Sequence, residues 1–592
     1  MPTSSMLRST PSTRSPAAAL PQMAADTALP LEFDLDLLSR PADRVRPAVV
    51  ARPALIFAAC FVAILALQQW TGAHRVERGI YSDDAGHFMN GLLIRDYLTT
   101  ALGQNPVTFA ENYYLSYPKI APLMWPPLFH VTLGLLLLLG GPPAATALSL
   151  VAATAAWLMW RTYMFARELA GPAAGVLAAA LTITVPLVVT LLSVVMLDVA
   201  IAAIALEAGY WLARYARSSA KLDAVLFGVF TACACLTKGN GVAVVLMPVA
   251  FIAITRRFDL VRKSGLYISA AIVIVFAVPL LAASAMFDAA IGDFGPVTVA
   301  IVLDRLRFYV GHLSDYVGLP IVVMSSIGMV LAIRRGWKRS EPESLPLAEI
   351  LASLVIAGGV FHLLNPHQVS VTRYLTMIVG PVTALACFAT WDLADRLQML
   401  PGRTTARVVT VFALVLATIA MRPAPRDLTT LGYREAIGRL AARGEIAGRR
   451  LLVISDEVGE GAFVTEGAVL GLQPAPMMGR GSKLLASDTW GGQNLRLRYA
   501  SPAALLEDLE AMHIDYVLID LSDGARELPY FSQVVALART EPARFAPEFS
   551  LTAGPSGPRR SLSLYKVTSP SAGPAKPFQI DLTSTLGRSL SR

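Results

Sequence analysis

The sequence predicts a polytopic α-helical membrane protein, of about eleven transmembrane helices, that ends in a small soluble α/β domain. The first observation is composition: the 592 residues are 55% hydrophobic and only 16% charged, which is too apolar for a soluble multidomain protein. The second is position: apolar runs of membrane-spanning length follow one another as far as about residue 421 and then stop. The remaining residues have the composition of a soluble domain.

The first 47 residues carry no element of this fold. The segment 1–47 is rich in Pro, Ser, Thr and Ala, and it contains no continuous apolar stretch of the kind that a signal peptide needs. A segment of this composition cannot bury enough apolar surface to offset the entropy of ordering it. We therefore expect a disordered cytoplasmic tail.

Residues 48–421 are expected to form the transmembrane domain. Its apolar runs are roughly 17 to 25 residues long, which is the length that a helix needs to cross a bilayer. We place the eleven runs near 49–70, 144–166, 172–195, 197–215, 222–237, 240–255, 265–287, 316–334, 347–364, 374–392 and 405–421.

Basic residues give this domain an orientation. Clusters of Lys and Arg fall at alternate connections between the spans. All of these clusters lie on the cytoplasmic side, as the positive-inside rule expects, only if the N-terminus is cytoplasmic. The net charge of +8 therefore reflects the orientation of the chain in the membrane. It is not evidence for nucleic-acid binding, which we exclude. A few basic residues fall on the outward side, where orientation does not require them; they are Lys119, Lys238, Arg305, Arg307 and Arg373.

The outward loop after the first span, about 71–143, is long enough to hold structure of its own. It contains the apolar run from His130 to Gly141, which is too short to span. Counting that run as a span would also place the later Arg clusters outside. We expect a juxtamembrane or re-entrant helix within a mostly helical loop.

Residues 422–592 are expected to form a periplasmic α/β domain. Arg450 to Ser455 and Ile514 to Asp520 have the apolar pattern of buried strands, and Pro502 to His513 forms an amphipathic helix before the second strand. An odd number of spans places this domain on the same side of the membrane as Asp83. No glycine-rich phosphate-binding motif follows either strand, so a nucleotide site is not supported.

Two adjacent acids, Asp83 and Asp84, directly follow the first span in the segment from Tyr81 to Phe88. Acids in the first turn of a helix are often structural, because they cap the helix and complement its dipole. A third acid, Asp198, lies at the start of a later span, where a carboxylate is costly to bury and is often functional. Together the three acids favour chemistry at one membrane face.

This set of motifs resembles the GT-C glycosyltransferases, in particular the group of protein O-mannosyltransferases and lipid A aminoarabinose transferases. The matches are Asp83-Asp84, then Lys119 followed by Pro126-Pro127-Leu128, then Met196-Leu197-Asp198. Six residues separate Lys119 from the double proline, which departs from the family pattern. Lys238 and Arg373-Tyr374 lie in weaker matches.

The resemblance implies an inverting transfer of a sugar from a polyprenyl-phosphate-linked donor to an extracytoplasmic glycan, lipid or protein acceptor. In such a reaction a carboxylate takes the acceptor proton and cations hold the departing lipid phosphate. The implied catalytic residues are Asp83 as the general base, with Asp84 and Asp198. The implied substrate-binding residues are Lys119, Lys238, Arg373, Tyr374 and His87.

No cofactor is certain. His362 and His367, with Asp83 or Asp84, could ligate a divalent metal ion, but no pair of histidines with helical ligand spacing requires one. Interfacial histidines are the preferred interpretation of this pattern.

Two other functions remain open at this point. A secondary transporter could also have eleven spans and buried acids, although transporters usually carry their acids near mid-membrane and in paired repeats. A non-catalytic cell-envelope assembly protein could use the C-terminal domain to bind its partners. The preferred interpretation is a multi-pass glycosyltransferase of the bacterial inner membrane, with its N-terminus in the cytoplasm.

Overall fold

The computed structural model describes most of the chain. The described residues are 47–78, 81–122, 124–141, 144–290, 295–338, 345–367, 370–396, 430–487, 495–552, 560–568, 574–582 and 587–591. Residues 53–592 form one compact unit, which holds every contact discussed below. Nearly all of the expected N-terminal tail, 1–47, and the last expected span, near 405–421, lie outside the described residues.

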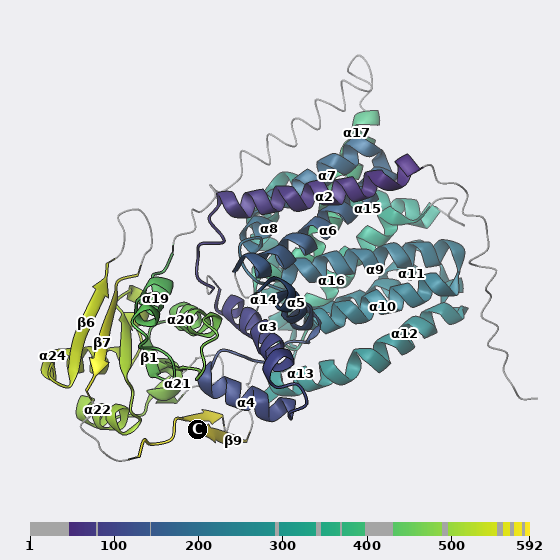
Figure 1. Cartoon of the computed structure of the whole chain (residues 1–592). Coiled ribbons are helices and arrows are strands. Elements are labelled where there is room, and N and C mark those ends of the chain that lie inside the picture. Colours follow the sequence, from purple (N-terminus) through teal and green to yellow (C-terminus); the bar gives the residue numbers. More distant parts are fainter. Residues whose placement is uncertain are drawn as a thin grey trace, which may run out of the picture. The chain divides into compact units, whose positions relative to one another are not determined.

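Helices make up the membrane region, defined here as residues 53–396, and several of the long ones run alongside one another in Figure 1. Their bounds are α2 (Pro47–Trp70), α3 (Ser82–Thr100), α4 (Pro106–Ser116), α5 (Leu128–Gly140), α6 (Ala144–Ala170), α7 (Pro172–Thr184), α8 (Pro186–Leu191), α9 (Asp198–Ser218), α10 (Lys221–Thr237), η1 (Gly239–Gly241), α11 (Val242–Thr255), η2 (Phe258–Arg262), α12 (Ser264–Phe276), α13 (Val278–Ala290), α14 (Val299–Leu313), η3 (Ser314–Gly318), α15 (Leu319–Lys338), α16 (Leu347–Leu364), η4 (Thr372–Ile378) and α17 (Val379–Arg396).

Within the described residues, five helical stretches are long and apolar enough to cross a membrane, or six if α12 and α13, bent by 48°, count as one span. The five are Pro53–Trp70, Ala144–Ala170, Val299–Lys338, Leu347–Leu364 and Thr372–Arg396. The expected spans near 197–215, 222–237 and 240–255 are helices, but they do not meet this criterion of length and composition. The expected count of eleven is therefore not confirmed.

Two expected spans have different bounds in the structure. The run 172–195 is not one helix, because α7 ends at Thr184 and α8 begins at Pro186. Proline lacks the N–H that a continuous helix needs and disfavours helical geometry in the residue before it, and Val185 has a ψ of 123°. The expected span 316–334 belongs to a longer helical stretch, Val299–Lys338, which passes through the π-helical turn η3.

Helix α9 lies at the centre of the membrane region, packed against α6, α10, α16 and η4. A buried ion pair joins it to α6, with Arg161 donating two hydrogen bonds to Glu207. The indole N–H groups of Trp157 and Trp211 donate to the same carboxylate at 3.1 and 2.9 Å. Because four donor contacts satisfy this buried carboxylate, the pair serves the packing of the bundle.

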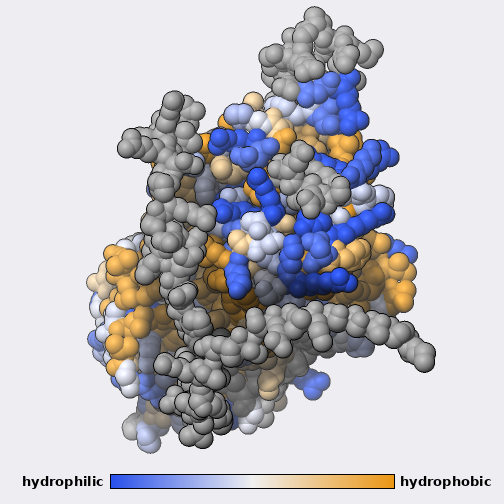
Figure 2. Space-filling model, turned by 90° about the vertical axis from the view of Figure 1, so that its right-hand side faces the viewer, coloured by the Kyte–Doolittle hydropathy of each residue, from blue (hydrophilic) through white to orange (hydrophobic). Residues whose placement is uncertain are grey.

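Hydrophilic residues gather on the face of the molecule that Figure 2 shows, with hydrophobic residues around them. In Figure 1 this is the right-hand side, where α10, α11 and α12 extend outward. The connections 218–221 and 256–263 carry basic residues of the clusters that the positive-inside rule assigns to the cytoplasm.

The C-terminal region, defined as residues 430–591, contains a five-stranded mixed sheet in the order β2-β1-β5-β7-β6. Strand β1 pairs in parallel with β2 and β5, whereas β7 pairs antiparallel with β5 and β6. The expected strands and helix are confirmed as β1, β5 and α22. The elements are α19 (Tyr433–Ala442), β1 (Arg450–Ile454), α20 (Glu457–Val469), β2 (Met477–Arg480), α21 (Gly481–Leu484), β3 (Ala486–Ser487), β4 (Arg496–Leu497), α22 (Pro502–Ala511), β5 (Tyr516–Asp520), α23 (Asp523–Arg526), α24 (Phe531–Thr540), β6 (Phe545–Leu551), β7 (Leu562–Val567), β8 (Gln579–Leu582) and β9 (Arg588–Ser591).

The fold class is therefore confirmed as a helical membrane region followed by a smaller α/β region. The short helix expected in the outward loop is α5, and α3 and α4 make the rest of that loop mostly helical. Helix α20 of the C-terminal region packs directly on α3, so residues far apart in sequence meet where α3 begins.

Candidate functional site

The two adjacent acids at the start of α3 lie in different environments. The Asp84 side chain is completely buried, and its Oδ1 accepts a hydrogen bond from the backbone N–H of Val195 at 2.7 Å. The Asp83 side chain keeps 21% of its surface exposed and forms an ion pair with Arg373. Asp84 therefore fastens α3 to the chain before α9, while Asp83 is accessible.

The third acid, Asp198, pairs with a lysine inside the bundle. Lys238, which follows α10, donates from Nζ to Asp198 Oδ1 at 2.6 Å, and the acid is 1% exposed. The same Nζ lies 4.9 Å from the centre of the Tyr374 ring, which stacks on His362 at 5.3 Å. Asp198 Oδ2 has no hydrogen-bond partner among the described residues.

Arg305 binds the chain that precedes Arg373. Arg305 of α14 is 4% exposed and donates to the backbone carbonyls of Leu363, Asn365 and His367. These carbonyls belong to the end of α16 and to the chain leading into η4, where Arg373 lies. The sequence marks Arg305 as an unexplained outward cation, and the structure assigns it to this loop.

A cavity opens beside Asp83, between α3 and the C-terminal region. It encloses about 60 Å³ and is lined by residues of both regions. From the membrane region come Ser82, Asp83, Gly86, Tyr114, Pro118, Lys119, Ile120, Ala121, Met124 and Trp125; from the C-terminal region come Glu457, Arg480 and Lys483.

Lys119 projects into this cavity from the loop between α4 and α5. Its Nζ lies 3.9 Å from Glu457 Oε1 at the start of α20. Burial, reinforced by the charge of Arg480, lowers the pKa of Lys119 to about 8, although Glu457, Glu460 and Asp83 oppose the shift. Lys119 is thus a cation whose charge changes near neutral pH.

Arg480 joins the C-terminal region to the Lys119 loop. Its Nη1 donates to the carbonyl of Pro118 at 3.0 Å, and its Nε donates to Glu460 at 2.7 Å. Glu460 also accepts from the backbone N–H and the hydroxyl of Ser482, at 2.8 and 2.6 Å. These contacts fix the C-terminal wall of the cavity.

His87, predicted to contact substrate, does not line the cavity. It is 2% exposed, its Nδ1 lies 3.1 Å from His130 Nε2, and its ring lies 4.2 Å from that of Trp125. Burial lowers the pKa of His87 well below its usual value, with a further contribution from His130, so the ring is neutral. His87 therefore packs against Trp125, which lines the cavity.

The described residues do not bring together a set of metal ligands. No group of three or more His, Cys, Asp or Glu side chains converges as metal ligands within the part of the chain that the structure describes. Asp83 pairs with Arg373, and His362 stacks on Tyr374. A divalent ion bound by His362, His367 and an acid of α3 is therefore not supported by the donor set.

The structure brings three of the eight predicted site residues to the cavity or to its wall. Asp83, Arg373 and Lys119 lie at the cavity or pair with a residue of its wall. Sequence reasoning missed Glu457, Arg480 and Lys483, because nothing in the pattern of the C-terminal region shows which of its charged residues face α3. Glu77, described below, was also missed.

The comparisons with known proteins agree with this architecture. Residues 140–293 match the family described as Dolichyl-phosphate-mannose-protein mannosyltransferase. A comparison with curated protein sequences gave no significant match.

Several solved structures have a similar fold over most of the chain. The crystal structure of ArnT from Cupriavidus metallidurans in the apo state is similar with a TM-score of 0.55 at 14% identity, covering 89% of this chain and 100% of that one. ArnT bound to undecaprenyl phosphate gives 0.52 at 14% identity, covering 87% and 99%. The apo oligosaccharyltransferase of Archaeoglobus fulgidus gives 0.50 at 12% identity, covering 91% and 76%. Residues 140–293 are thus similar to the mannosyltransferase family, and the chain as a whole has the multi-pass helical membrane fold of GT-C type that ArnT and the Archaeoglobus fulgidus oligosaccharyltransferase share.

Proposed function

We propose that this protein transfers a sugar from a polyprenyl-phosphate-linked donor to an acceptor outside the cytoplasm, with Asp83 as the general base. The observation that carries the proposal is the difference among the three acids. Asp84 and Asp198 are buried and bound to Val195 and Lys238, whereas Asp83 faces the cavity. A base must reach the proton that it takes, so Asp83 is the acid that fits the role.

The reaction is a single displacement at the anomeric carbon. The acceptor oxygen attacks that carbon while its proton passes to the Asp83 carboxylate, and the bond from the anomeric carbon to the phosphate oxygen breaks. The electron pair of that bond leaves with the lipid phosphate. Attack from the face opposite the leaving group inverts the configuration of the sugar.

Arg373, Lys238 and Lys119 supply the positive charge that such a leaving group needs. In the structure Arg373 is paired with Asp83. A lipid phosphate that draws the guanidinium toward itself would release the Asp83 carboxylate to meet the acceptor hydroxyl. Donor binding would then prepare the base for the acceptor.

The similar structures support the donor class, because one of them is ArnT bound to undecaprenyl phosphate. We extend the proposal to the bacterial inner membrane, with a cytoplasmic N-terminus, a transmembrane domain of 48–421 and a periplasmic domain of 422–592. The contact between Lys119 and Glu457 supports placing the C-terminal region on the side of the membrane where Asp83 lies.

The test of the base is Asp83→Asn, which removes the proton acceptor and preserves the size of the side chain. Mass analysis of lipids, glycans and exported proteins from a strain lacking the gene identifies donor and acceptor, and transfer is then measured with purified protein. We expect a loss of about 10²–10⁴-fold in kcat. Binding of undecaprenyl phosphate should persist, and turnover near the wild-type rate would show that Asp83 is not the base.

Arg373 is tested through the donor. An arginine can hold a phosphate with two parallel hydrogen bonds, whereas a lysine presents only a point charge. Arg373→Lys should therefore weaken undecaprenyl phosphate binding, and Arg373→Ala should weaken it further, by about 2–5 kcal/mol if the contact is desolvated. Unchanged donor dependence with normal turnover would reduce Arg373 to a structural partner of Asp83.

The assembly-protein alternative makes the opposite prediction in cells. A protein that acts only by binding partners keeps its function when the base is removed. Complementation of the deletion strain by Asp83→Ala would therefore favour that alternative over a transferase.

A further inference from the structure

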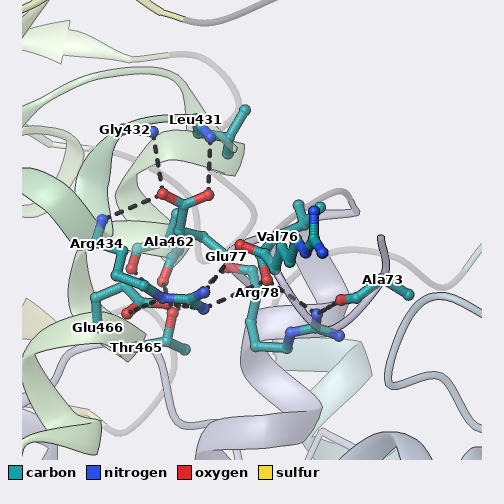
Figure 3. A network of polar contacts seen from close by, with 12 residues as sticks. Ala73, Val76, Glu77, Arg78, Leu431, Gly432, Arg434, Ala462, Thr465 and Glu466 are labelled. Atoms are coloured by element: carbon teal, nitrogen blue, oxygen red, sulfur yellow. Dashed lines mark hydrogen bonds and ion pairs between the residues drawn. The ribbon is translucent and has the colours of Figure 1, made fainter. Parts of the chain in front are cut away.

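A glutamate of the membrane region caps a helix of the C-terminal region. The carboxylate of Glu77, which is completely buried, accepts hydrogen bonds from the backbone N–H groups of Leu431, Gly432 and Arg434 at 2.8, 3.0 and 3.2 Å (Figure 3). These N–H groups lie at the start of α19, whose own N-cap residue, Gly432, has no side chain to satisfy them. We call this arrangement the Glu77 cap.

The segment that carries Glu77 is tied to both regions of the protein. Arg434 donates from Nη1 to the carbonyl of Arg75 at 2.8 Å, and it also holds Glu466 of α20 with two hydrogen bonds of 3.0 Å. On the other side, Arg78 donates to the carbonyl of Ser193 at 3.4 Å, two residues before the backbone N–H that Asp84 binds. Residues 75–78 are therefore fixed between the C-terminal region and the chain before α9.

Helix α20 also touches the first turn of α3 directly, at a glycine. A Cβ atom on Gly461 would lie 2.9 Å from the Cβ of Ala85 and 3.3 Å from Cε of Lys119. Carbon atoms normally pack at about 3.5–4.0 Å, so even one methyl group would push the two helices apart by roughly half an ångström. This contact lies two residues after Asp83.

We propose, on the basis of the proposed function, that the C-terminal region is a positioning element of the active site. The Glu77 cap and the Gly461 contact together hold the first turn of α3 so that Asp83 faces the cavity. The C-terminal region then sets kcat through the placement of Asp83, besides supplying part of the cavity wall. Asp83 remains the catalytic residue, and Gly461 and Glu77 act through it.

Gly461→Ala is the direct test, with Gly438→Ala as the matched control. Gly438 lies on α19 of the same region, and a Cβ atom there meets nothing within 4 Å. Both proteins are purified at full length, and hydrogen exchange of the α3 backbone amides and transfer kinetics are measured. We expect Gly461→Ala to speed exchange at the start of α3 and to lower kcat about 10-fold, because displacements below 1 Å already misalign reacting groups. Gly438→Ala should change neither.

A compensating change separates this contact from general destabilisation. Ala85→Gly removes the methyl group that the new side chain at position 461 would meet. The double variant should therefore recover kcat and slow α3 exchange to the level of Ala85→Gly alone. A lack of recovery, with thermal stability unchanged among the variants, would overturn the proposal.

Glu77→Gln gives a second, independent perturbation. It removes the charge that holds three N–H groups and keeps the size of the side chain, so α3 exchange should rise and kcat should fall while KM for the donor changes little. Normal kcat in both Gly461→Ala and Glu77→Gln would refute the positioning role. If both variants speed hydrogen exchange in α3 but wild-type protein transfers no sugar, the proposed function fails, while the coupling between the C-terminal region and α3 stands. Unchanged α3 exchange in both variants would refute that coupling.

Discussion

The contact between Lys119 and Glu457 should set the alkaline limit of donor use. Lys119 has a pKa of about 8, so its positive charge disappears over the pH range in which an assay is run. If that charge binds the lipid phosphate, kcat/KM for the donor should fall as the pH rises through 8. Glu457→Gln removes a carboxylate that favours the charged form and should move this fall to lower pH.

The size of the shift follows from the geometry. Glu457 is half exposed, so solvent screens the pair, and at 3.9 Å two unit charges in a medium as polar as water interact by about 1 kcal/mol. One pKa unit corresponds to about 1.4 kcal/mol, so the alkaline limb should move down by roughly 0.8 pH unit. Arg480, Glu460 and Asp83 also face Lys119 and remain unchanged in this variant.

The assay is the pH profile of kcat/KM for the donor, which reports ionisations of the free enzyme. Glu435→Gln is the control, since Glu435 pairs with Arg439 on the exposed side of α19. An alkaline limb at the same pH in wild type and Glu457→Gln would refute the assignment of that limb to Lys119.

As the pH rises through 8, the contribution of Lys119 to stability should increase while donor use falls. This difference separates ionisation of Lys119 from unfolding as the cause of lost activity. Lys119 has a lower pKa in the folded protein than in an unfolded chain, where it would be 10.5. Between about pH 8 and 10.5 the unfolded chain therefore binds more protons, and the contribution of Lys119 to stability rises with pH. Loss of donor use above pH 8 without a fall in Tm would thus reflect ionisation and not unfolding.

Three further predictions concern the surroundings of the site. Arg305→Ala should raise KM for the donor several-fold, because it frees three carbonyls of the chain before Arg373, the proposed phosphate ligand, whereas Arg307→Ala, a highly exposed position on the same helix, should leave donor kinetics unchanged. Asp84→Ala should lower the free energy of unfolding by about 1–3 kcal/mol, because it leaves the buried backbone N–H of Val195 unpaired, and an unchanged Tm would contradict this. In spheroplasts, an impermeant thiol reagent should label a cysteine at Ser501 but not at Ser218, and protection of Ser501 would place the C-terminal region in the cytoplasm.

The sequence by itself was sufficient for the fold class. Apolar content and its end near residue 421 indicated a helical membrane region followed by a soluble one, because the bilayer and the α/β core impose different hydrophobic patterns on the chain. The ordered motifs around Asp83, Lys119 and Asp198 resemble those of the GT-C glycosyltransferases, and the solved structures show the same fold type. The predicted bounds of the spans were less accurate where a proline interrupts a helix, as at Pro186.

Only the tertiary structure distinguished the acids. Asp83 and Asp84 are adjacent residues of the same type, so the sequence does not separate their roles. In the structure Asp83 faces a cavity, whereas Asp84 accepts a hydrogen bond from the backbone N–H of Val195, more than a hundred residues away. Lys119 and Asp83 have partners that lie even farther away along the chain, Glu457 and Arg373. Local patterns record which face of an element is apolar, whereas the contacts that set charge and accessibility at this site depend on the packing of remote segments.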